Sequence, residues 1–319
     1  MHTSPAASPR KSALLPLAVR RWVDSWVGID EPLPPVDKQV DWLRILPLVL
    51  LHVACGAVIW VGWSWTAVAV AAVLYVVRMF AITAFYHRYF SHRTFKTSRA
   101  MQFVFAVLGN SSVQRGPLWW AAHHREHHLN SDTPEDTHSP VREGFWWSHV
   151  GWIAAKYNFS TRRERVKDLL KFPELVFLDR FDTLVPLLLF ASMYGLGELL
   201  AYAAPGLGTS GWQMLVWTLI STCCLFHGTF TINSLAHLWG SRRFQTTDHS
   251  RNNWFLAILT LGEGWHNNHH HYQGSVRQGF KWWEYDFSYY TLVVMSWFGL
   301  VWALNPVPAV VMERRLERR

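Results

Sequence analysis

Cysteine is scarce in this 319-residue sequence, and its three cysteines, Cys55, Cys223 and Cys224, all lie in apolar runs. Such a set predicts no disulfide framework, and the cysteines are interpreted as small core hydrophobes. The first 44 residues contain no compact apolar segment followed by a cleavage site, so no secretory signal peptide is expected. The fold must therefore be stabilised by apolar burial, by a membrane or by a bound group.

Charged residues are also few, at 16% of the chain, although the net charge is +8. The basic residues form neither an aromatic-interleaved RNA motif nor a recognition helix, so nucleic acid is not an expected partner. An anionic membrane surface accounts for the same charge. The sequence is rich in tryptophan, with 20 residues, and tryptophan concentrates at membrane–water interfaces.

Four apolar stretches are long enough to cross about 30 Å of hydrocarbon as helices. They cover residues 45–63, 65–86, 184–204 and 212–236. The links at 63–65 and 205–211 are short, which predicts two helical hairpins. Two further apolar stretches, 101–120 and 289–304, are interrupted by Gly, Asn or Pro and are expected to lie in or under the interface, as is the segment 12–29. The predicted fold is an all-α integral membrane protein.

The distribution of basic residues predicts the orientation. Six of the 30 Lys and Arg precede the first span, 14 lie between Arg88 and Arg180, and nine follow the fourth span. Only Arg78 lies inside a span, and the two short links carry none. By the positive-inside rule, both termini and the middle segment face the cytoplasm. The sequence thus divides into a cytosolic N-terminal segment (1–44), a main domain (45–304) with a cytosolic cap (87–183 and 237–304), and a charged tail (305–319). Residues 1–12 and 313–319 are expected to be disordered.

Histidines gather where the spans meet the cytoplasmic segments. The motifs are HRYFSH at 87–92, HREHH at 124–128, NSLAH at 233–237 and HNNHH at 266–270. In HxxHH the second and third histidines follow the first at i+3 and i+4, so all three share one helix face. His87 and His92, five apart, diverge by about 140° on an α-helix, so we expect that helix to end between them. Nine imidazoles suffice for two metal ions with four or five ligands each, but imidazole alone does not identify the metal.

With these motifs in this order, the sequence resembles the membrane fatty-acid desaturases, and in particular their Δ9, stearoyl-CoA desaturase-like branch. The segments HHLNSDTPEDTHSP, GFWWSHVGW, NSLAHLWG and GEGWHNNHH extend the resemblance over residues 45–304. The resemblance implies four transmembrane helices with a cytosolic helical cap that holds a non-haem di-iron centre. The implied iron ligands are His87, His92, His124, His127, His128, His237, His266, His269 and His270, with Asn233 contacting one metal through water.

The implied activity is O₂-dependent insertion of a cis double bond, at Δ9, into a saturated long-chain acyl substrate. Acyl-CoA is the favoured carrier, although the Arg-Asp pair that touches the acyl-CoA head in similar animal enzymes is replaced here by Ala122 and His123. A glycerolipid-linked chain is the main alternative, and acyl carrier protein is less favoured. Two electrons must come from a separate ferredoxin, rubredoxin or cytochrome b5-type donor with its reductase. The compact chain favours a bacterial cell membrane over the endoplasmic reticulum.

Tyr75, Trp120 and Phe230 are candidate lining of an apolar substrate tunnel, although ordinary packing is the better interpretation of most aromatic residues. The histidines outside the motifs, including His138 and His249, are interpreted as structural. Two other function classes stay open: a di-iron fatty-acid or alkane hydroxylase, which uses the same histidine scaffold, and a membrane metal carrier. Carriers place their ligands near the bilayer midplane, whereas these histidines lie at one end of the spans, so the carrier is least favoured.

Overall fold

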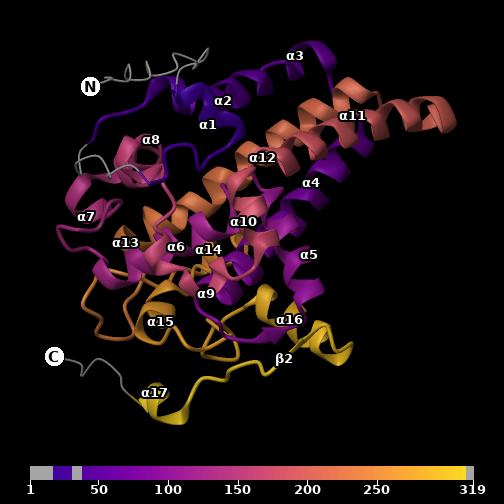
Figure 1. Cartoon of the computed structure of the whole chain (residues 1–319). Coiled ribbons are helices and arrows are strands. Elements are labelled where there is room, and N and C mark those ends of the chain that lie inside the picture. The colour runs from indigo at the N-terminus through magenta and orange to yellow at the C-terminus, as the bar shows by residue number, and fades with distance from the viewer. Residues whose placement is uncertain (1–16, 31–37, 314–319) are drawn as a thin grey trace, which may run out of the picture.

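The computed structural model describes residues 17–30 and 38–313 and is almost entirely helical in these ranges (Figure 1). Its two named strands, β1 (Lys96–Thr97) and β2 (Val301–Trp302), form one short antiparallel pair. The predicted disorder at 1–12 and 313–319 lies outside the described residues, except that Glu313 ends a short helix, α17 (Ala309–Glu313).

Four helical segments are long and apolar enough to span a membrane. They are Trp42–Val61, Trp65–Ser91, Leu184–Ala203 and Gly211–Leu238. The first combines α2 (Trp42–Cys55) and α3 (Val58–Val61), the second α4 (Trp65–Phe80) and η1 (Ala81–Ser91), the third is α11 (Leu184–Ala203), and the fourth combines α12 (Gly211–Asn233) and α13 (Leu235–Leu238). The four predicted spans are therefore confirmed as helices of spanning length, with ends that differ by a few residues.

Side-chain caps explain where several of these helices begin. Asp41, Ser64 and Ser210 accept hydrogen bonds from backbone amides in the first turns of α2, α4 and α12. Each cap satisfies an amide that has no partner within its own helix. The links between α3 and α4 and between α11 and α12 are short, as expected, and the second contains η5 (Pro205–Leu207).

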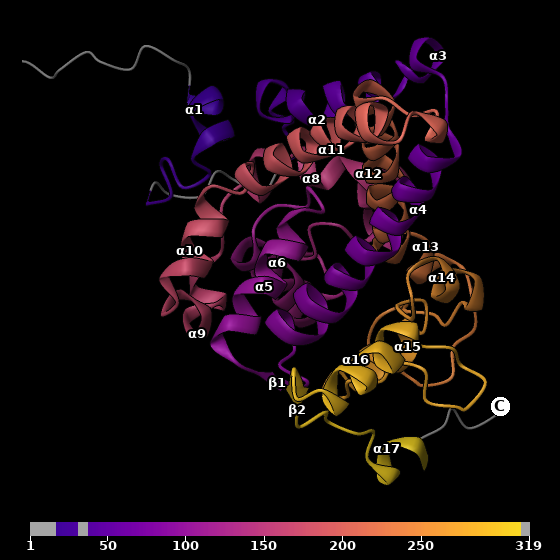
Figure 2. The same cartoon turned by 90° about the vertical axis from the view of Figure 1, so that its right-hand side faces the viewer.

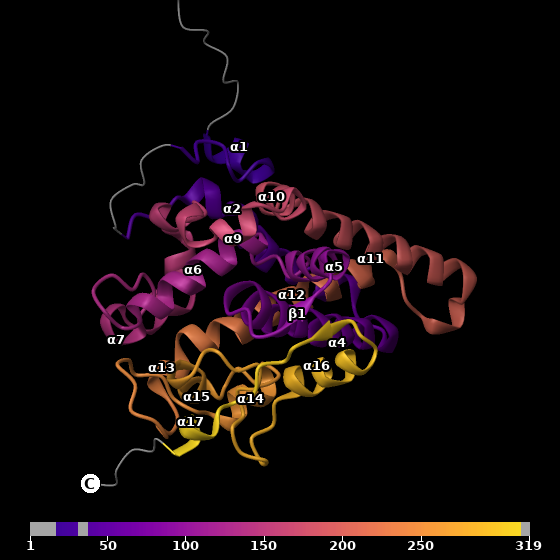
Figure 3. The ribbon, with the colours of Figure 1, turned by 60° about the horizontal axis from the view of Figure 1, so that its bottom comes forward.

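α12 is the central long helix, because it packs against α11, α4 and α2. In Figure 1 the long helices extend to the upper right, while α13, α14 (Trp254–Leu259) and α15 (His266–His271) lie towards their opposite end. Figures 2 and 3 show that the remaining short helices gather at that same end. The two-hairpin insertion and the cytosolic side of these short helices remain predictions, since the structure contains no membrane.

The other helices are short and surround the ends of η1 and α12. They are α1 (Leu17–Val23), α5 (Arg99–Asn110), α6 (Pro117–Asn130), α7 (Pro140–Glu143), η2 (Trp147–Gly151), α8 (Trp152–Ala154), η3 (Lys156–Asn158), η4 (Arg163–Arg165), α9 (Lys167–Leu170), α10 (Pro173–Arg180) and α16 (Phe287–Trp297). The predicted interruption of 101–120 is confirmed, since α5 ends at Asn110 and α6 begins at Pro117.

The second span changes its helical geometry before it ends. η1 is a π-helix of 11 residues, all of them buried. The helix ends at Ser91, between His87 and His92 as expected, but it ends as a π-helix, in which the His92 amide donates to the His87 carbonyl at 3.2 Å. In a π-helix with i→i+5 hydrogen bonds, residues i and i+5 are separated by about one helical turn. The wider helix therefore brings the two imidazoles to the same face, which an α-helix would not do.

Candidate metal centre

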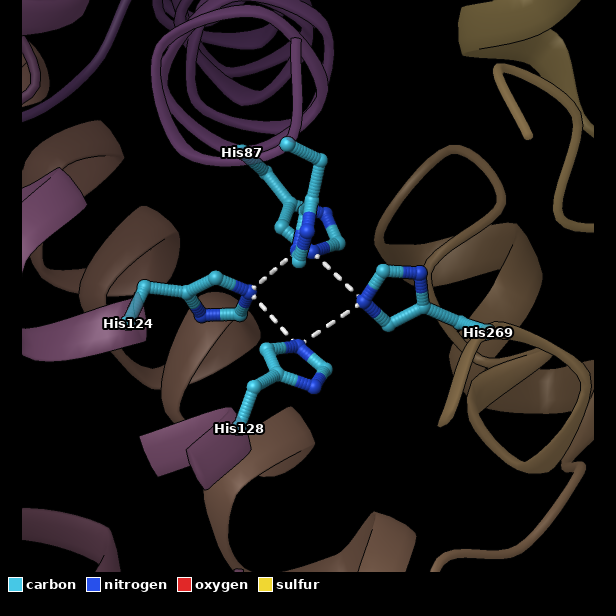
Figure 4. A group of neighbouring side chains, drawn as sticks. His87, His124, His128 and His269 are labelled. Atoms are coloured by element: carbon cyan, nitrogen blue, oxygen red, sulfur yellow. Dashed lines mark hydrogen bonds between the residues drawn. The ribbon is translucent and has the colours of Figure 1, made fainter. Parts of the chain in front are cut away.

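The nine histidines of the motifs form two groups, each with its ring nitrogens within 4.8 Å of one another. The first group contains His87, His92, His124, His128 and His269, and the second contains His127, His237, His266 and His270. Figure 4 shows four members of the first group pointing towards a common centre. The adjacent residues His127 and His128 of α6 therefore belong to different groups, His128 to the first and His127 to the second.

The Nε2 atoms are the atoms that converge. In the first group the Nε2–Nε2 distances are 3.0 Å for His87–His269, 2.8 Å for His92–His124, 2.9 Å for His124–His128 and 3.0 Å for His128–His269. In the second group His237 and His266 are 3.1 Å apart at the same atoms. The contacts of the first group form a chain from His87 to His92. A neutral imidazole Nε2 either carries the proton or accepts one, so an Nε2 inside this chain cannot donate to one neighbour and accept from the other. The arrangement is typical of ligands for a cation.

Arg125 fixes α6 against the end of η1. Its guanidinium donates to the carbonyls of Phe90 at 2.7 Å and Ser91 at 3.0 Å, and also pairs with Asp168. The other end of α6 is held by α10, because the buried Asp179 carboxylate accepts a hydrogen bond from the Trp119 amide at 2.7 Å. These contacts position the HREHH motif beside HRYFSH.

The two asparagines of HNNHH position the third motif. Asn267 Oδ1 accepts from the amides of Arg243 and Phe244, both at 2.8 Å. Asn268 donates to the carbonyl of Gln278 and to Glu284. Both asparagines are fully buried, so they tie α15 to the loops on either side and leave the histidines facing the two groups.

Four carboxylates contact the Nδ1 atoms of ligand histidines. Asp132 lies 3.0 Å from His237, Asp136 lies 3.2 Å from His127, Asp248 lies 2.5 Å from His270, and Glu263 pairs with His87. A carboxylate at Nδ1 holds the imidazole in the tautomer whose Nε2 lone pair is free for a metal. His270 Nε2 is buried and has no hydrogen-bond partner, as such a ligand would be without its metal. The residues present therefore fit two metal ions.

Sequence reasoning missed these carboxylates as functional residues. Asp132 and Asp136 lie within the motif segment HHLNSDTPEDTHSP, but their partners His237 and His127 could not be assigned from spacing. Asp136 also lies 3.4 Å from Nδ1 of His138, whose ring is 4.4 Å from that of His127. His138 is thus connected to the second group through Asp136, although it is not one of the nine.

Six of the nine imidazoles have lowered pKa values, which favours their neutral, metal-binding form. Burial, reinforced by neighbouring imidazoles, places the pKa values of His92, His124, His128, His266 and His269 well below the usual range. Burial also lowers the pKa of His270 to about 4, although Asp248 opposes the shift. His127 differs: burial lowers its pKa, but Asp136, Asp132 and Asp248 together outweigh burial, so the net shift of the pKa is upward. Since a ligand must lose its proton before it binds, most of the site is ready for a cation at neutral pH.

These shifts predict that the metal-free protein loses stability in acid. Below the unfolded value of about 6.5, unfolded histidines take up protons that the folded site resists, so the free energy of unfolding falls as the pH is lowered towards 4. We expect the Tm of metal-free protein in detergent to fall between pH 7 and pH 5, and bound metal to reduce that fall. A Tm that is constant over this range would contradict the neutral histidine cluster.

The predicted water-mediated ligand and tunnel residues lie as follows. Asn233 ends α12, four residues before His237, and its carbonyl accepts from Ser148 Oγ at 2.8 Å. Trp120 stacks on His124, with ring centroids 5.0 Å apart. Phe230 packs in a small apolar cluster with Trp119. Tyr75 donates to the Leu259 carbonyl at 2.8 Å, which anchors its phenol between α4 and α14. Their roles towards metal or substrate remain predictions.

Comparison with known proteins adds independent support. Residues 63–293 match the family model described as fatty acid desaturase. The chain is 36% identical to an sn-1 stearoyl-lipid 9-desaturase of Anabaena variabilis, over 82% of this chain and 93% of that protein. It is 35% identical to an acyl-CoA 5-desaturase, AL21, of Anemone leveillei (92% and 91%) and to a delta-9 acyl-lipid desaturase 1 of Arabidopsis thaliana (88% and 88%). With its histidines gathered into two metal-binding groups, this chain belongs to the fatty acid desaturase family.

Proposed function

We propose that the protein is an O₂-dependent desaturase that introduces a cis Δ9 double bond into a saturated long-chain acyl group for membrane lipid synthesis. The observation that carries the proposal is the pair of histidine groups, five and four, whose Nε2 atoms converge. In the overall reaction, a CH₂–CH₂ unit, O₂, two electrons and two protons give a cis alkene and two waters. The acyl chain supplies two of the four hydrogens in the two waters, and the two protons supply the other two. The two electrons from the chain's C–H bonds and the two external electrons together reduce O₂ to water.

Two iron ions, when bound, would supply the oxidant that an unactivated methylene requires and that no side chain provides. His87, His92, His124, His128 and His269 would hold one ion, and His127, His237, His266 and His270 the other. The chain's own task is to fix these imidazoles and exclude water. His87, His237, His266 and His269 are no more than 3% exposed, which agrees with that task.

The Δ9 position follows the branch that the motifs resemble and the names of two relatives, whereas the third relative is a 5-desaturase. For the carrier, the position next to HREHH is informative. Ala122 and His123 are buried, and His123 Nε2 lies 3.2 Å from the Ser160 carbonyl, so this position presents no charged pair to a coenzyme A head. We therefore propose a glycerolipid-linked chain as the first carrier and acyl-CoA as the second.

Electrons must reach the metals from a separate protein of the ferredoxin, rubredoxin or cytochrome b5 type. A cleft of about 400 Å³ borders the five-histidine group and is lined by Ser91, His92, Arg125, His128, Leu129, Gln273 and Gly274. Since His92 and His128 are members of that group, this cleft offers an approach from solvent to the histidines. We propose that the cleft, both termini and the cap (87–183 and 237–304) face the cytoplasm of a bacterial cell.

Expression in a host with a simple fatty-acid profile tests the proposal. Gas chromatography–mass spectrometry of the host lipids should show a new cis-9 alkene, and His128→Ala should remove it. A new alcohol would instead assign the protein to the hydroxylases. No new product, despite folded and metal-loaded protein and a working donor, would contradict both enzymatic assignments and leave the metal carrier.

Tyr75 provides a test of chain-length control. It lies 12 residues before His87, about 18 Å along the helix axis, where a phenol could stop the methyl end of an acyl chain. If it is the stop, Tyr75→Ala should shift conversion towards longer saturated chains. Tyr75→Phe is the matched control, because it keeps the ring and loses only the bond to Leu259. An unchanged product profile in an active Tyr75→Ala variant would assign the residue to packing alone.

A further inference from the structure

A second, larger cavity lies away from the predicted tunnel residues. Its volume is about 910 Å³, at the upper end of the range of about 300–1,000 Å³ for ligand pockets. α2, α11 and α12 supply most of its walls, together with residues next to α1, α5 and α10. Tyr75, Trp120 and Phe230 are not among the residues that line it. The cavity is overwhelmingly apolar, so an apolar occupant is required to fill it.

α2 and α11, which both line the cavity, are helices of spanning length. Leu50 on α2 and Leu187 on α11 both line it, and they are 55% and 62% exposed. Along α2 the lining runs from Arg44 to Ala54, which is about 15 Å at 1.5 Å per residue. That length is half of a hydrocarbon core of about 30 Å. The cavity thus has the depth of one membrane leaflet and faces the lipid.

The end of the cavity beside the predicted cytosolic surface is polar. Arg44, Arg115 and Asp182 line it there, and Asp182 pairs with Arg115 at 2.7 Å. Arg44 donates to Ser25 Oγ at 3.1 Å and to the Arg21 carbonyl, and within the described ranges it pairs with no carboxylate. Two guanidinium groups and one carboxylate leave a net positive charge at this end. A planar guanidinium is well suited to a phosphate group.

The inner wall of the cavity leads towards the histidines. Ile45, Leu48, Val113, Ile153 and Phe226 line the cavity and also belong to the apolar cluster around Trp119 and Phe230. Trp120 packs on the same cluster and stacks on His124 of the five-histidine group. The apolar cluster that borders the cavity is therefore connected through Trp120 to the five-histidine group.

From these observations we propose that the cavity is a lateral lipid-binding site that admits one acyl chain of a glycerophospholipid from the cytosolic leaflet. The phosphate lies at Arg44 and the acyl chain follows α2. To reach the histidines, the chain must then move past the apolar cluster that contains Phe226 and contacts Trp120. The inference rests on the proposed desaturase function and names the route by which a membrane-borne substrate reaches it.

Blocking the cavity tests the site. Ala54→Trp fills it, and the matched control is Val53→Trp, the adjacent residue of α2, which is 68% exposed and does not line the cavity. After delipidation, dipalmitoyl phosphatidylglycerol is added back and bound lipid is counted by native mass spectrometry. We expect Ala54→Trp to lower lipid retention and the conversion of phospholipid-linked chains by about tenfold or more relative to Val53→Trp, which corresponds to about 1.4 kcal/mol of lost binding. Conversion of stearoyl-CoA should change by less than about twofold in either variant.

Leu187→Trp at the lateral opening gives a second blocking variant that leaves the core intact, and melting curves confirm folding of each protein. Lipid retention and phospholipid conversion equal to the control in both blocked variants would overturn the proposal. If the blocked variants lose stearoyl-CoA conversion to the same extent as phospholipid conversion, the proposal is also overturned, because both carriers would then use one tunnel. If the unmodified protein retains the phospholipid and the blocked variants do not, but no chain is desaturated on either carrier, the lipid site stands and the desaturase assignment fails.

Discussion

Replacing His128 by alanine should abolish desaturation while the protein still inserts into the membrane. His128 Nε2 lies 2.9 Å from that of His124 and 3.0 Å from that of His269, and its ring is 4.4 Å from that of His270 in the other group. Its loss removes a ligand and disturbs the boundary between the groups. We expect turnover to fall by at least about 100-fold, more than for loss of a residue that only orients a ligand. Product formation in membranes with matched protein content measures the effect.

The same loss is expected for alanine at His87, His124, His237, His266 or His270. His249 provides the comparison, because it belongs to neither group and its side chain is 49% exposed; its contact with the site is indirect, through Asp132, which lies 3.3 Å from its Nδ1. Replacing His249 or His138 should be milder, with His138 intermediate through its contact with Asp136. Near-normal turnover of His128→Ala would show that the ligand assignment is wrong.

Asp248→Asn should weaken metal binding by about 10- to 100-fold without changing any ligand. Asp248 Oδ2 lies 2.5 Å from His270 Nδ1, while Oδ1 accepts from Ser250. Burial raises the pKa of Asp248, but His270 and the hydrogen bonds from Ser250 together outweigh burial and keep that pKa far below its usual range, so Asp248 is a carboxylate at neutral pH. The asparagine amide carries no negative charge, so it does not raise the basicity of the His270 imidazole, and His270 binds a metal less strongly. Competition with a chelator, followed by iron analysis, measures the weakened binding.

Added iron should restore much of the activity of Asp248→Asn, because all nine histidines remain. Glu135→Gln is the control, since Glu135 lies in the same motif segment as Asp136 but is exposed and bonds only to Thr133. Wild-type metal retention by Asp248→Asn would remove Asp248 from the site, and a loss that iron cannot restore would indicate a role other than orienting His270.

The sequence predicted the spans and the histidine set for simple physical reasons. Membrane-spanning helices need long apolar runs, and an HxxHH motif places three imidazoles on one helix face whatever surrounds it. Both signals are local, so they can be recognised in the sequence without knowledge of the tertiary structure. The grouping of HREHH was not local: His124 and His128 face one group and His127 the other, which depends on where α15 and α13 pack.

The features that could not be predicted depend on geometry or on distant pairs. A spacing of five residues conflicts with an α-helix. The helix does end between His87 and His92, at Ser91, but the spacing alone did not predict that η1 is a π-helix. Asp248 and Glu263 orient His270 and His87 from 22 and 176 residues away along the chain, so neither pairing follows from spacing, although Glu263 itself lies in the segment GEGWHNNHH. The lateral cavity likewise arises from helices that are far apart in the sequence.

The central claim, a di-iron desaturase, is tested most directly by measuring metal content and activity on the same samples. Protein from iron-rich medium should bind two iron ions per chain, and activity with a reduced donor should rise in proportion to iron. Zinc in some preparations would not matter, because imidazole accepts it readily, but zinc protein should be inactive. One ion per active chain, or full activity with zinc alone, would contradict the account.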